Sequence, residues 1–251
     1  MQVLSSPPVP AATPFHLNEV EAAGQITRLW TWNDGLFARL RVPGPQPARE
    51  PTHLTLRLPD PAAHPLPLTL TAGADLQVSG YLADVPYQES GAQFLKKLPR
   101  AQQQGLPTWL KDVQVARIAT HVIVTALTQT PQAPYTNQAR LDGVIATQWS
   151  RHGVRYVRLA IYDEHTPLLP QDPTRRKAHF VSVQFPTGFA CRVGQRVRVA
   201  GGLFEKTYRQ SLAAFLAKSQ PKRTLPATLA AEQLTRAQGA TYLRAQQVVG
   251  F

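Results

Sequence analysis

The sequence predicts an all-β protein with short helices, built from two tandem five-stranded barrels. Residues 73–97 align with residues 194–218 at a constant offset of 121, and 10 of these 25 positions are identical. A period of this length matches a small domain and is far longer than the repeat of a solenoid. The 251 residues are therefore expected to hold two copies of one unit, each with a modest core.

The first copy contains five short segments with the alternation of β-strands. Residues 24–30 and 36–42 flank Asn33-Asp34-Gly35, which is a hairpin signal because such turns need residues that tolerate positive φ. A third strand over residues 54–58 ends at Pro59, a fourth follows Gly73, and a fifth covers residues 115–124.

The second copy repeats this order. Its strands cover residues 143–149, 154–162 and 181–185, a segment after Gly194, and residues 241–249. Five strands in about 110 residues, with a long excursion between the fourth and the fifth, are typical of the oligonucleotide/oligosaccharide-binding (OB) barrel. Within the second excursion, residues 211–218 and 226–238 predict short helices.

The composition also indicates boundaries between the parts of the chain. Residues 1–18 are rich in proline and poor in charge, which predicts a disordered tail. Prolines at 131 and 134 indicate a linker over residues 131–138. We therefore expect one OB fold over residues 19–130 and a second over residues 139–251.

The net charge of +12 lies almost entirely in the second copy. Residues 1–133 carry 10 Lys and Arg against 9 Asp and Glu, whereas residues 134–251 carry 17 against 6. Charge confined to one of two related domains predicts a binding face for a polyanion there.

Other features bound the cellular setting. No segment approaches the ~20 apolar residues of a membrane span, and the N-terminus lacks the pattern of a signal peptide. The single cysteine, Cys191, excludes an intramolecular disulfide framework and a Cys-rich zinc site. These observations predict a cytoplasmic protein without a membrane partner.

Strand alternation places basic and aromatic side chains of the second copy on one face. This combination suits single-stranded nucleic acid, because cations neutralise phosphates and rings stack on unpaired bases. The candidate binding residues of the second copy are Arg155, Tyr156, Arg158, Tyr162, Arg196, Arg198, Phe204, Lys206, Tyr208, Arg209, Lys218, Lys222 and Arg223.

The first copy offers a less basic version of this face. Its candidate residues are Phe37, Arg39, Arg41, Tyr81 and Tyr87. Its fourth strand has Asp75 and Gln77 where the second copy has arginines, so we expect weaker binding or a role in subunit contact. The tryptophans divide into Trp30 and Trp149, favoured as core residues, and Trp32 and Trp109, which lie in loops and are open to either stacking or burial.

Two segments of the second copy resemble the bacterial single-stranded DNA-binding proteins (SSB). They are residues 194–203, followed by Tyr208, and the strand over residues 179–185. The resemblance implies that Tyr208, and Tyr87 as its counterpart, stack on bases. Two OB folds in one chain resemble the SSB branch that works as a dimer of two-domain chains. The acidic C-terminal tail of that family is missing here, and so is its third-strand tryptophan, since Ala178 lies nearest that place.

The sequence contains no phosphate-binding loop and no zinc-protease helix. Asp163-Glu164-His165 is read as a solvated loop, so we expect no metal, no cofactor and no enzyme activity. The favoured function is sequence-independent binding of single-stranded DNA in replication, recombination or repair, by a homo-oligomer that is most simply a dimer. The alternatives are an OB-fold assembly module of a replication or repair complex and an RNA-binding OB protein.

Overall fold

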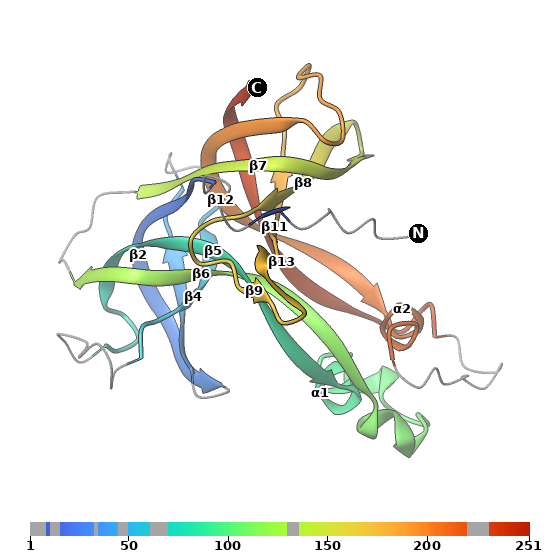
Figure 1. Ribbon diagram of the computed structural model, residues 1–251. Helices are drawn as coiled ribbons and strands as arrows, with labels where there is room; N and C mark the ends of the chain where they lie inside the picture. The colour runs from blue at the N-terminus through green and yellow to red at the C-terminus, as the bar shows by residue number, and fades with distance from the viewer. Residues whose placement is uncertain are drawn as a thin grey trace. The chain divides into compact units, whose positions relative to one another are not determined.

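The predicted fold class is confirmed: the computed structural model is an all-β structure with short helices (Figure 1). It describes residues 9–10, 16–32, 35–44, 50–60, 70–129, 136–219 and 231–251. The chain folds into two compact units. The first comprises Met1–Asp84, Thr120–Glu205 and Thr241–Phe251, and the second comprises Val85–Ala119 and Lys206–Ala240.

The first barrel is closed by five strands, as the sequence predicts for the first copy. They are, in spatial order, β2 (Asn18–Trp32), β3 (Gly35–Val42), β4 (Thr52–Arg57), β6 (Gln114–Gln129) and β5 (Asp75–Ser90), which pairs again with β2. The β4–β6 pair is parallel, whereas β2 pairs antiparallel with both β3 and β5. This closure on the first strand is the OB arrangement.

The second barrel repeats this topology. Its spatial order is β7 (Thr136–Arg151), β8 (Val154–Ile161), β11 (His179–Gln184), β13 (Thr235–Gly250) and β12 (Arg196–Ser211), which pairs again with β7. Between β8 and β11 the chain forms β9 (Leu168–Leu169) and β10 (Asp172–Arg176). These two strands make a small separate sheet with β1 (Val9–Pro10).

Strand bounds show that the duplication extends well beyond the region where sequence identity is visible. The bounds of β6 and β13 differ by 121 residues, as do those of β5 and β12, while β3 and β8 differ by 119. Each first strand also carries the same irregularity, between Ile26 and Arg28 in β2 and between Ile145 and Thr147 in β7. Equivalent residues of the two copies can therefore be compared one by one.

The first strands of the two barrels also pair with each other. Residues 18–23 of β2 run antiparallel to residues 136–141 of β7, and Val20 faces Ala139, its own equivalent in the other copy. A contact between equivalent residues at the centre of an antiparallel pair is the signature of a two-fold axis. One continuous apolar cluster fills both barrels, with Ile26, Leu40, Ile145 and Leu159 fully buried.

Two equivalent asparagines reinforce this pseudo-symmetry. Asn18 donates from Nδ2 to the Leu82 carbonyl and accepts the Leu82 amide at Oδ1, with distances of 2.8 and 3.0 Å. Asn137 makes the same pair of bonds to Leu203, at 2.7 and 2.8 Å. Each asparagine side chain therefore extends the hydrogen bonding between the first and fourth strands of its barrel.

Two of the identical glycines mark close approaches of backbone to backbone. A Cβ atom at Gly80 would lie 2.0 Å from the carbonyl oxygen of Ile123, and one at Gly201 would lie 2.0 Å from that of Arg244. No other residue fits such a distance, because the neighbouring atom belongs to the backbone of the adjacent strand.

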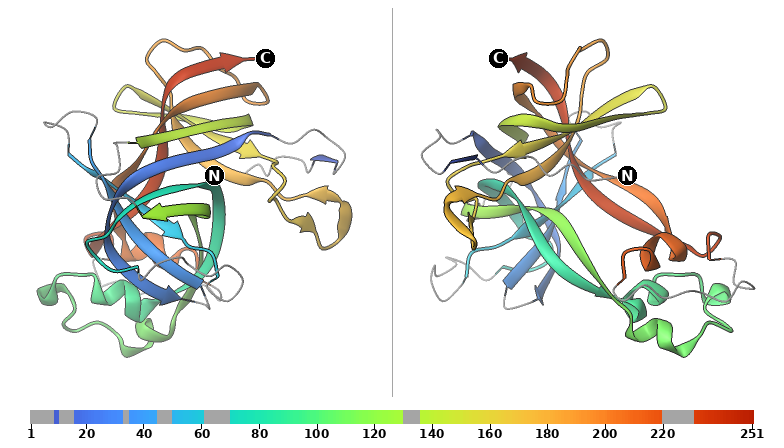
Figure 2. Two further views of the ribbon diagram at one scale, coloured as in Figure 1. Left: turned by 90° about the vertical axis from the view of Figure 1, so that its left-hand side faces the viewer. Right: turned by 45° about the vertical axis from the view of Figure 1, so that its right-hand side comes forward.

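The second unit consists of two excursions that we call arm 1 (residues 85–119) and arm 2 (residues 206–240). Arm 1 contains α1 (Gly91–Lys96) and the 3-10 turns η1 (Arg100–Gln102) and η2 (Thr108–Asp112), and arm 2 contains α2 (Leu212–Leu216) (Figure 1; Figure 2, right). The arms share a separate apolar core, in which Phe94 meets Phe215, its own equivalent, with ring centroids 4.7 Å apart.

The shared sequence pattern of the arms is explained by this core and by helix capping. Ser90 and Ser211 are the N-caps of α1 and α2, and each accepts a hydrogen bond from the backbone amide three residues on. In α1 the Gln93 side chain accepts the Ser90 amide in return, which completes a capping box. The helix predicted over residues 211–218 is thus confirmed as α2.

The structure differs from the sequence-based expectations at three places. Residues 9–10 and 16–18, expected in a disordered tail, include β1 and the start of β2, and the His16 amide bonds to the Tyr162 carbonyl at 2.9 Å. Residues 136–138 of the expected linker belong to β7, and residues 235–238 of the expected second helix belong to β13. In each case pairing with a strand distant in sequence overrides a local signal. The proposed domain boundaries stay a prediction.

Candidate nucleic-acid interface

The outer face of the second barrel carries a row of aromatic rings from four strands. Trp149 of β7 stacks on Tyr156 of β8 with centroids 5.6 Å apart and planes 13° apart. Tyr156 meets Tyr242 of β13 edge-on at 5.8 Å, and Tyr242 meets Phe204 of β12 at 5.6 Å. We call Trp149, Tyr156, Tyr242 and Phe204 the aromatic row.

The first barrel has a shorter row at the equivalent positions. Trp30 stacks on Phe37 at 5.8 Å and 15°, and His121 meets Phe37 edge-on at 5.8 Å. Where the second barrel continues to Phe204, the first barrel has Ala83, which is buried. The surface available for base stacking is therefore larger on the second barrel.

The exposure of these rings corrects several predictions. Phe37, Tyr156 and Tyr162 were expected to point outward, but they are 3%, 4% and 5% exposed. The first two lie beneath a tryptophan of the neighbouring strand, and Tyr162 packs against His16. Trp30 and Trp149, favoured as core residues, are instead half-buried and stack on Phe37 and Tyr156. Within the aromatic row, Trp149, Tyr242 and Phe204 are all partly exposed.

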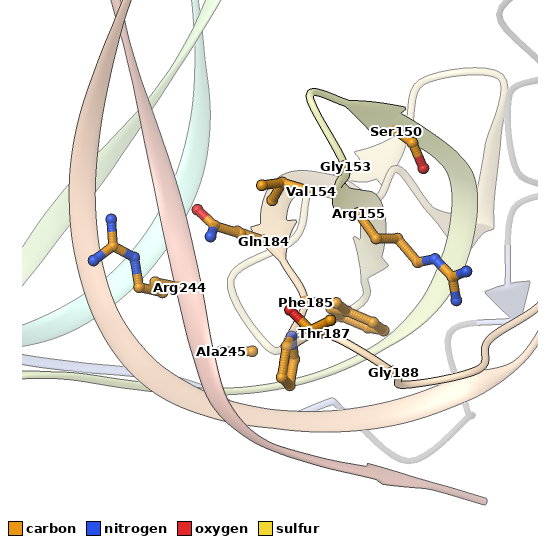
Figure 3. A pocket seen from close by; sticks show the side chains of 11 residues that line it. Ser150, Gly153, Val154, Arg155, Gln184, Phe185, Thr187, Gly188, Arg244 and Ala245 are labelled. Atoms are coloured by element: carbon orange, nitrogen blue, oxygen red, sulfur yellow. The ribbon is translucent and has the colours of Figure 1, made fainter.

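Two exposed arginines line a pocket of the second barrel, and one of them reaches a ring of the aromatic row. Arg155 at the start of β8 is exposed and donates from Nη1 to the Phe189 carbonyl at 2.5 Å. Arg244 of β13 is exposed, with its guanidinium carbon 4.7 Å from the centroid of Phe204. Both line a pocket of about 300 Å³, together with Ser150, Gln184, Phe185 and Thr187 (Figure 3).

Neither arginine has a counterpart in the first barrel. The equivalent of Arg155 is Leu36, and the equivalent of Arg244 is Ile123. The barrel fold therefore does not require a cation at either position. Cations beside partly exposed rings are the combination that binds unpaired bases and their phosphates.

The predicted cations Arg196 and Arg198 are exposed, but their charge is partly compensated. Arg198 forms two hydrogen bonds with the buried carboxylate of Asp142, at 2.7 and 2.9 Å, and Arg196 lies 3.9 Å from the same carboxylate. The hydrogen bonds and charge of Asp142 raise the pKa of Arg198. The ring of Phe251 lies over both guanidinium groups.

Arg39 and Arg158 were predicted to neutralise phosphates, but they are half-buried between the barrels. Arg39 of the first barrel is ion-paired with Glu205 on the fourth strand of the second. Its equivalent, Arg158, acts on Asp84, which is the equivalent of Glu205 on the fourth strand of the first barrel. Burial raises the pKa of Asp84, while the amide of Phe180 and the charge of Arg158 counteract this rise. Reciprocal charge interactions of this kind follow from the pseudo-two-fold axis.

The remaining predicted residues lie in several settings. Arg41 is exposed on β3, and Tyr81 stacks on His165 with centroids 3.8 Å apart. In the arms, Arg209 and Lys218 are exposed, whereas Lys206, Tyr87 and Tyr208 are half-buried. Lys222 and Arg223 lie outside the described residues. Trp32 contacts Phe37, and Trp109 packs against the core of the arms.

Sequence reasoning missed Tyr242, Arg244 and His121. All three belong to fifth strands, which show little identity between the copies. The sequence signal that could have found them is the offset of 121 between the two copies, which continues without a gap from the fourth strand into the fifth. This offset makes His121 the equivalent of Tyr242. Extending the alignment would have placed these residues on the same face as Phe37 and Tyr156.

His121 makes the first barrel sensitive to acid. Burial, followed by the charges of Arg39 and Arg57, lowers its pKa from 6.5 to about 4. The folded state therefore binds this proton less readily than the unfolded state. Stability is complete above pH 6.5 and is lost as the pH falls toward 4.

We expect this histidine alone to cost about 2 kcal/mol of unfolding free energy between pH 7.5 and pH 5. Urea unfolding of the wild type and of His121→Tyr, which installs the residue of the second barrel, measures the difference. The variant should lose that part of the pH dependence. Burial also lowers the pKa values of His16 and His179, so part of the dependence should persist in the variant. Identical pH profiles for both proteins would refute the assignment to His121.

The described part of the chain lacks two further features. No group of three or more His, Cys, Asp or Glu side chains in the described part of the chain could hold a metal ion. No helix within the described ranges is long and apolar enough to cross a membrane.

Fold and site together define a tandem OB-fold protein with an aromatic and basic face on its second barrel. Among solved structures, the wild-type single-stranded DNA-binding protein of Thermus aquaticus matches with a TM-score of 0.52 at 15% identity. The match covers 94% of this chain and 93% of that one. A deletion mutant of the same protein matches with a TM-score of 0.53 at 14% identity, covering 94% of both chains.

At these identities the likeness establishes the fold, which is that of these single-stranded DNA-binding proteins. No protein-family model and no curated protein matches the chain.

Proposed function

We propose that the protein binds single-stranded DNA without sequence preference, through the outer face of its second barrel. The observation that carries this proposal is the set of partly exposed rings Trp149, Tyr242 and Phe204, with Arg244 over the ring of Phe204 and Arg155 lining the same pocket as Arg244. The first barrel has neither arginine, and at the position equivalent to Phe204 it has Ala83 instead of an aromatic residue. The likeness to SSB structures supports the same ligand.

In this mechanism the single-stranded DNA lies across β8, β11, β13 and β12. The partly exposed rings stack on successive bases, which contributes about 1–3 kcal/mol per base. Arg155 and Arg244 neutralise the phosphates between them. The pocket beside Arg155 has room for one nucleobase turned out of the row, with Ser150, Gln184 and Thr187 as hydrogen-bonding groups.

The test is fluorescence anisotropy with labelled oligo-dT, oligo-U and duplex DNA at two salt concentrations. Tight, salt-sensitive binding of oligo-dT in preference to duplex is the expected result. Stronger binding of oligo-U than of oligo-dT would move the proposal to RNA. Equal and weak binding of all three probes would contradict it.

The variant Arg155→Leu/Arg244→Ile, which installs the residues of the first barrel, should weaken oligo-dT binding at least about tenfold at 50 mM salt. The log–log salt slope should fall by about 1.4, since each lost contact to a single strand is worth about 0.7. Arg28→Thr is the matched control, because it replaces an exposed arginine of the first barrel by the residue found at the equivalent position 147. An unchanged slope in the double variant would exclude this face.

We further propose that the chain acts as a binding protein without catalysis, in the cytoplasm, during replication, recombination or repair, and as a homodimer. These proposals rest on the composition of the chain and on its resemblance to two-domain SSBs. Mass photometry at nanomolar concentrations would test the dimer directly.

A further inference from the structure

The interface between the two arms contains a buried charged cluster that the barrel site does not use. Arg236 of arm 2 is fully buried and donates two hydrogen bonds to Glu89 of arm 1, at 2.5 and 2.6 Å, and a third to Gln210 at 3.0 Å. Arg117 and Lys97 of arm 1 approach the same carboxylate, with nitrogen–oxygen distances of 3.3 and 3.7 Å.

The cluster has more positive than negative charge. One carboxylate, Glu89, faces the three cations Arg236, Arg117 and Lys97. The Lys97 side chain is 54% exposed, but the side chain of Arg117 is only 10% exposed. Burial, followed by the charge of Arg236, lowers the pKa of Lys97. Burying excess charge of one sign destabilises a fold unless a counter-ion compensates it.

Hydrogen bonding is incomplete on the same side of the cluster. Within the described residues, Nη2 of Arg117 is buried without a hydrogen-bond partner, and Nε, although 3.3 Å from the Glu89 carboxylate, makes no hydrogen bond either. The guanidinium carbon of Arg117 lies 5.4 Å from the ring centroid of Phe215, a contact that leaves its N–H donors unused. Each buried donor without a partner costs about 1–3 kcal/mol.

The fold does not require Arg117. The equivalent position in arm 2 is Gln238, and both positions lie on equivalent strands of the two arms. A buried cation that lowers stability, and that the equivalent arm lacks, is a candidate functional residue. Natural proteins keep such destabilising groups mainly where binding or catalysis needs them.

We propose that Arg117 and Lys97 form a phosphate-binding site for the backbone of single-stranded DNA, on arm 1 and additional to the barrel face. A phosphate supplies the negative charge that the cluster lacks and accepts the unused donors of Arg117. Lys97 lies at the exposed side of the cluster and provides the approach. Tyr87 is half-buried and lies two residues before Glu89 on β5, so its ring faces the same side of the strand.

This inference rests on the proposed function, because it assigns a second contact of the same strand. The inferred ligand is the phosphate backbone, because Glu89 already accepts two hydrogen bonds from Arg236 and the donors left on Arg117 belong to a guanidinium, which matches phosphate oxygens geometrically.

The variant Arg117→Gln tests the inference, because it installs the residue of arm 2 at the equivalent position. Binding of oligo-dT at 50 mM salt should weaken about five- to tenfold, and the log–log salt slope should fall by about 0.7. The urea midpoint should stay unchanged or rise, since an uncompensated buried cation is removed. Lys111→Gln is the matched control, because it removes the same charge from an exposed position of arm 1 and should leave affinity nearly unchanged.

The outcomes separate the two proposals. Failure of the wild type to bind oligo-dT overturns the proposed function itself. Binding by the wild type with unchanged affinity and slope in Arg117→Gln overturns the arm site alone. Equal losses in Arg117→Gln and Lys111→Gln also overturn it, because the effect would then come from a general positive field.

Discussion

Replacement of Glu89 by glutamine is expected to lower the free energy of unfolding by about 3–5 kcal/mol, because a buried guanidinium loses its carboxylate. Arg236 is fully buried and makes both of its ionic hydrogen bonds to Glu89. Urea unfolding at pH 7, together with amide hydrogen exchange in residues 85–119, measures the effect and places it in the arms.

The chain provides a matched control for this result. At the equivalent positions, Gln210 replaces Glu89 and Val115 replaces Arg236. The double variant Glu89→Gln/Arg236→Val therefore copies a pair that the fold already accommodates, and it should recover the part of the lost stability that comes from Arg236, because the fully buried guanidinium is removed together with its carboxylate. Similar midpoints for the single and the double variant would argue against an ionic origin.

The pH dependence of this pair has a definite sign. Burial alone would raise the pKa of Glu89, but the hydrogen bonds and charge of Arg236, followed by Lys97 and Arg117, lower it below its ordinary value. The stabilisation is therefore present above the ordinary pKa of a glutamate and is lost as the pH falls through the lowered value. The wild type and Glu89→Gln should converge in stability in strong acid.

The substitution Gly201→Ala is expected to destabilise the second barrel by at least about 3 kcal/mol, at the upper end of overpacking effects. The added Cβ would lie 2.0 Å from the carbonyl oxygen of Arg244, so β12 and β13 would have to separate. The measurement is the urea midpoint, with the yield of soluble protein as a second readout. Gly80→Ala should act in the same way on the first barrel.

The neighbouring glycine is the control for this prediction. A Cβ at Gly202 meets its nearest atom, the carbonyl oxygen of Asn137, at 3.3 Å, so Gly202→Ala should cost far less than Gly201→Ala. Comparable losses at both positions would show that β12 tolerates no side chain for another reason, such as the loss of glycine flexibility, rather than because of the close approach.

The fold could be predicted because its signals are local and occur twice. Turns, strand alternation and the identical glycines indicate five strands per copy without any knowledge of the tertiary structure. The site was less predictable, because alternation gives the side of a strand and not what covers it. Phe37 and Tyr156 lie on the predicted outer faces, but a tryptophan from the adjacent strand covers each of them.

The cations show a similar limit. Strand alternation places Arg39 and Arg158 on the outer faces of their strands. Only the packing of one barrel on the other reveals that they interact with Glu205 and Asp84. Arg117 was overlooked for the opposite reason: a single arginine in a strand gives no local sign that it shares one carboxylate with two other cations.

The pairing of β2 with β7 around Val20 and Ala139 has a consequence for how the two halves can differ. In a homodimer of single repeats, every substitution appears twice, once in each subunit. Here both halves of the pseudo-dimer are encoded in one chain, so each equivalent position can hold two different residues in a fixed one-to-one ratio. One barrel can keep Leu36, Ala83 and Ile123 while the other carries Arg155, Phe204 and Arg244, and no molecule can assemble with two halves of the same kind.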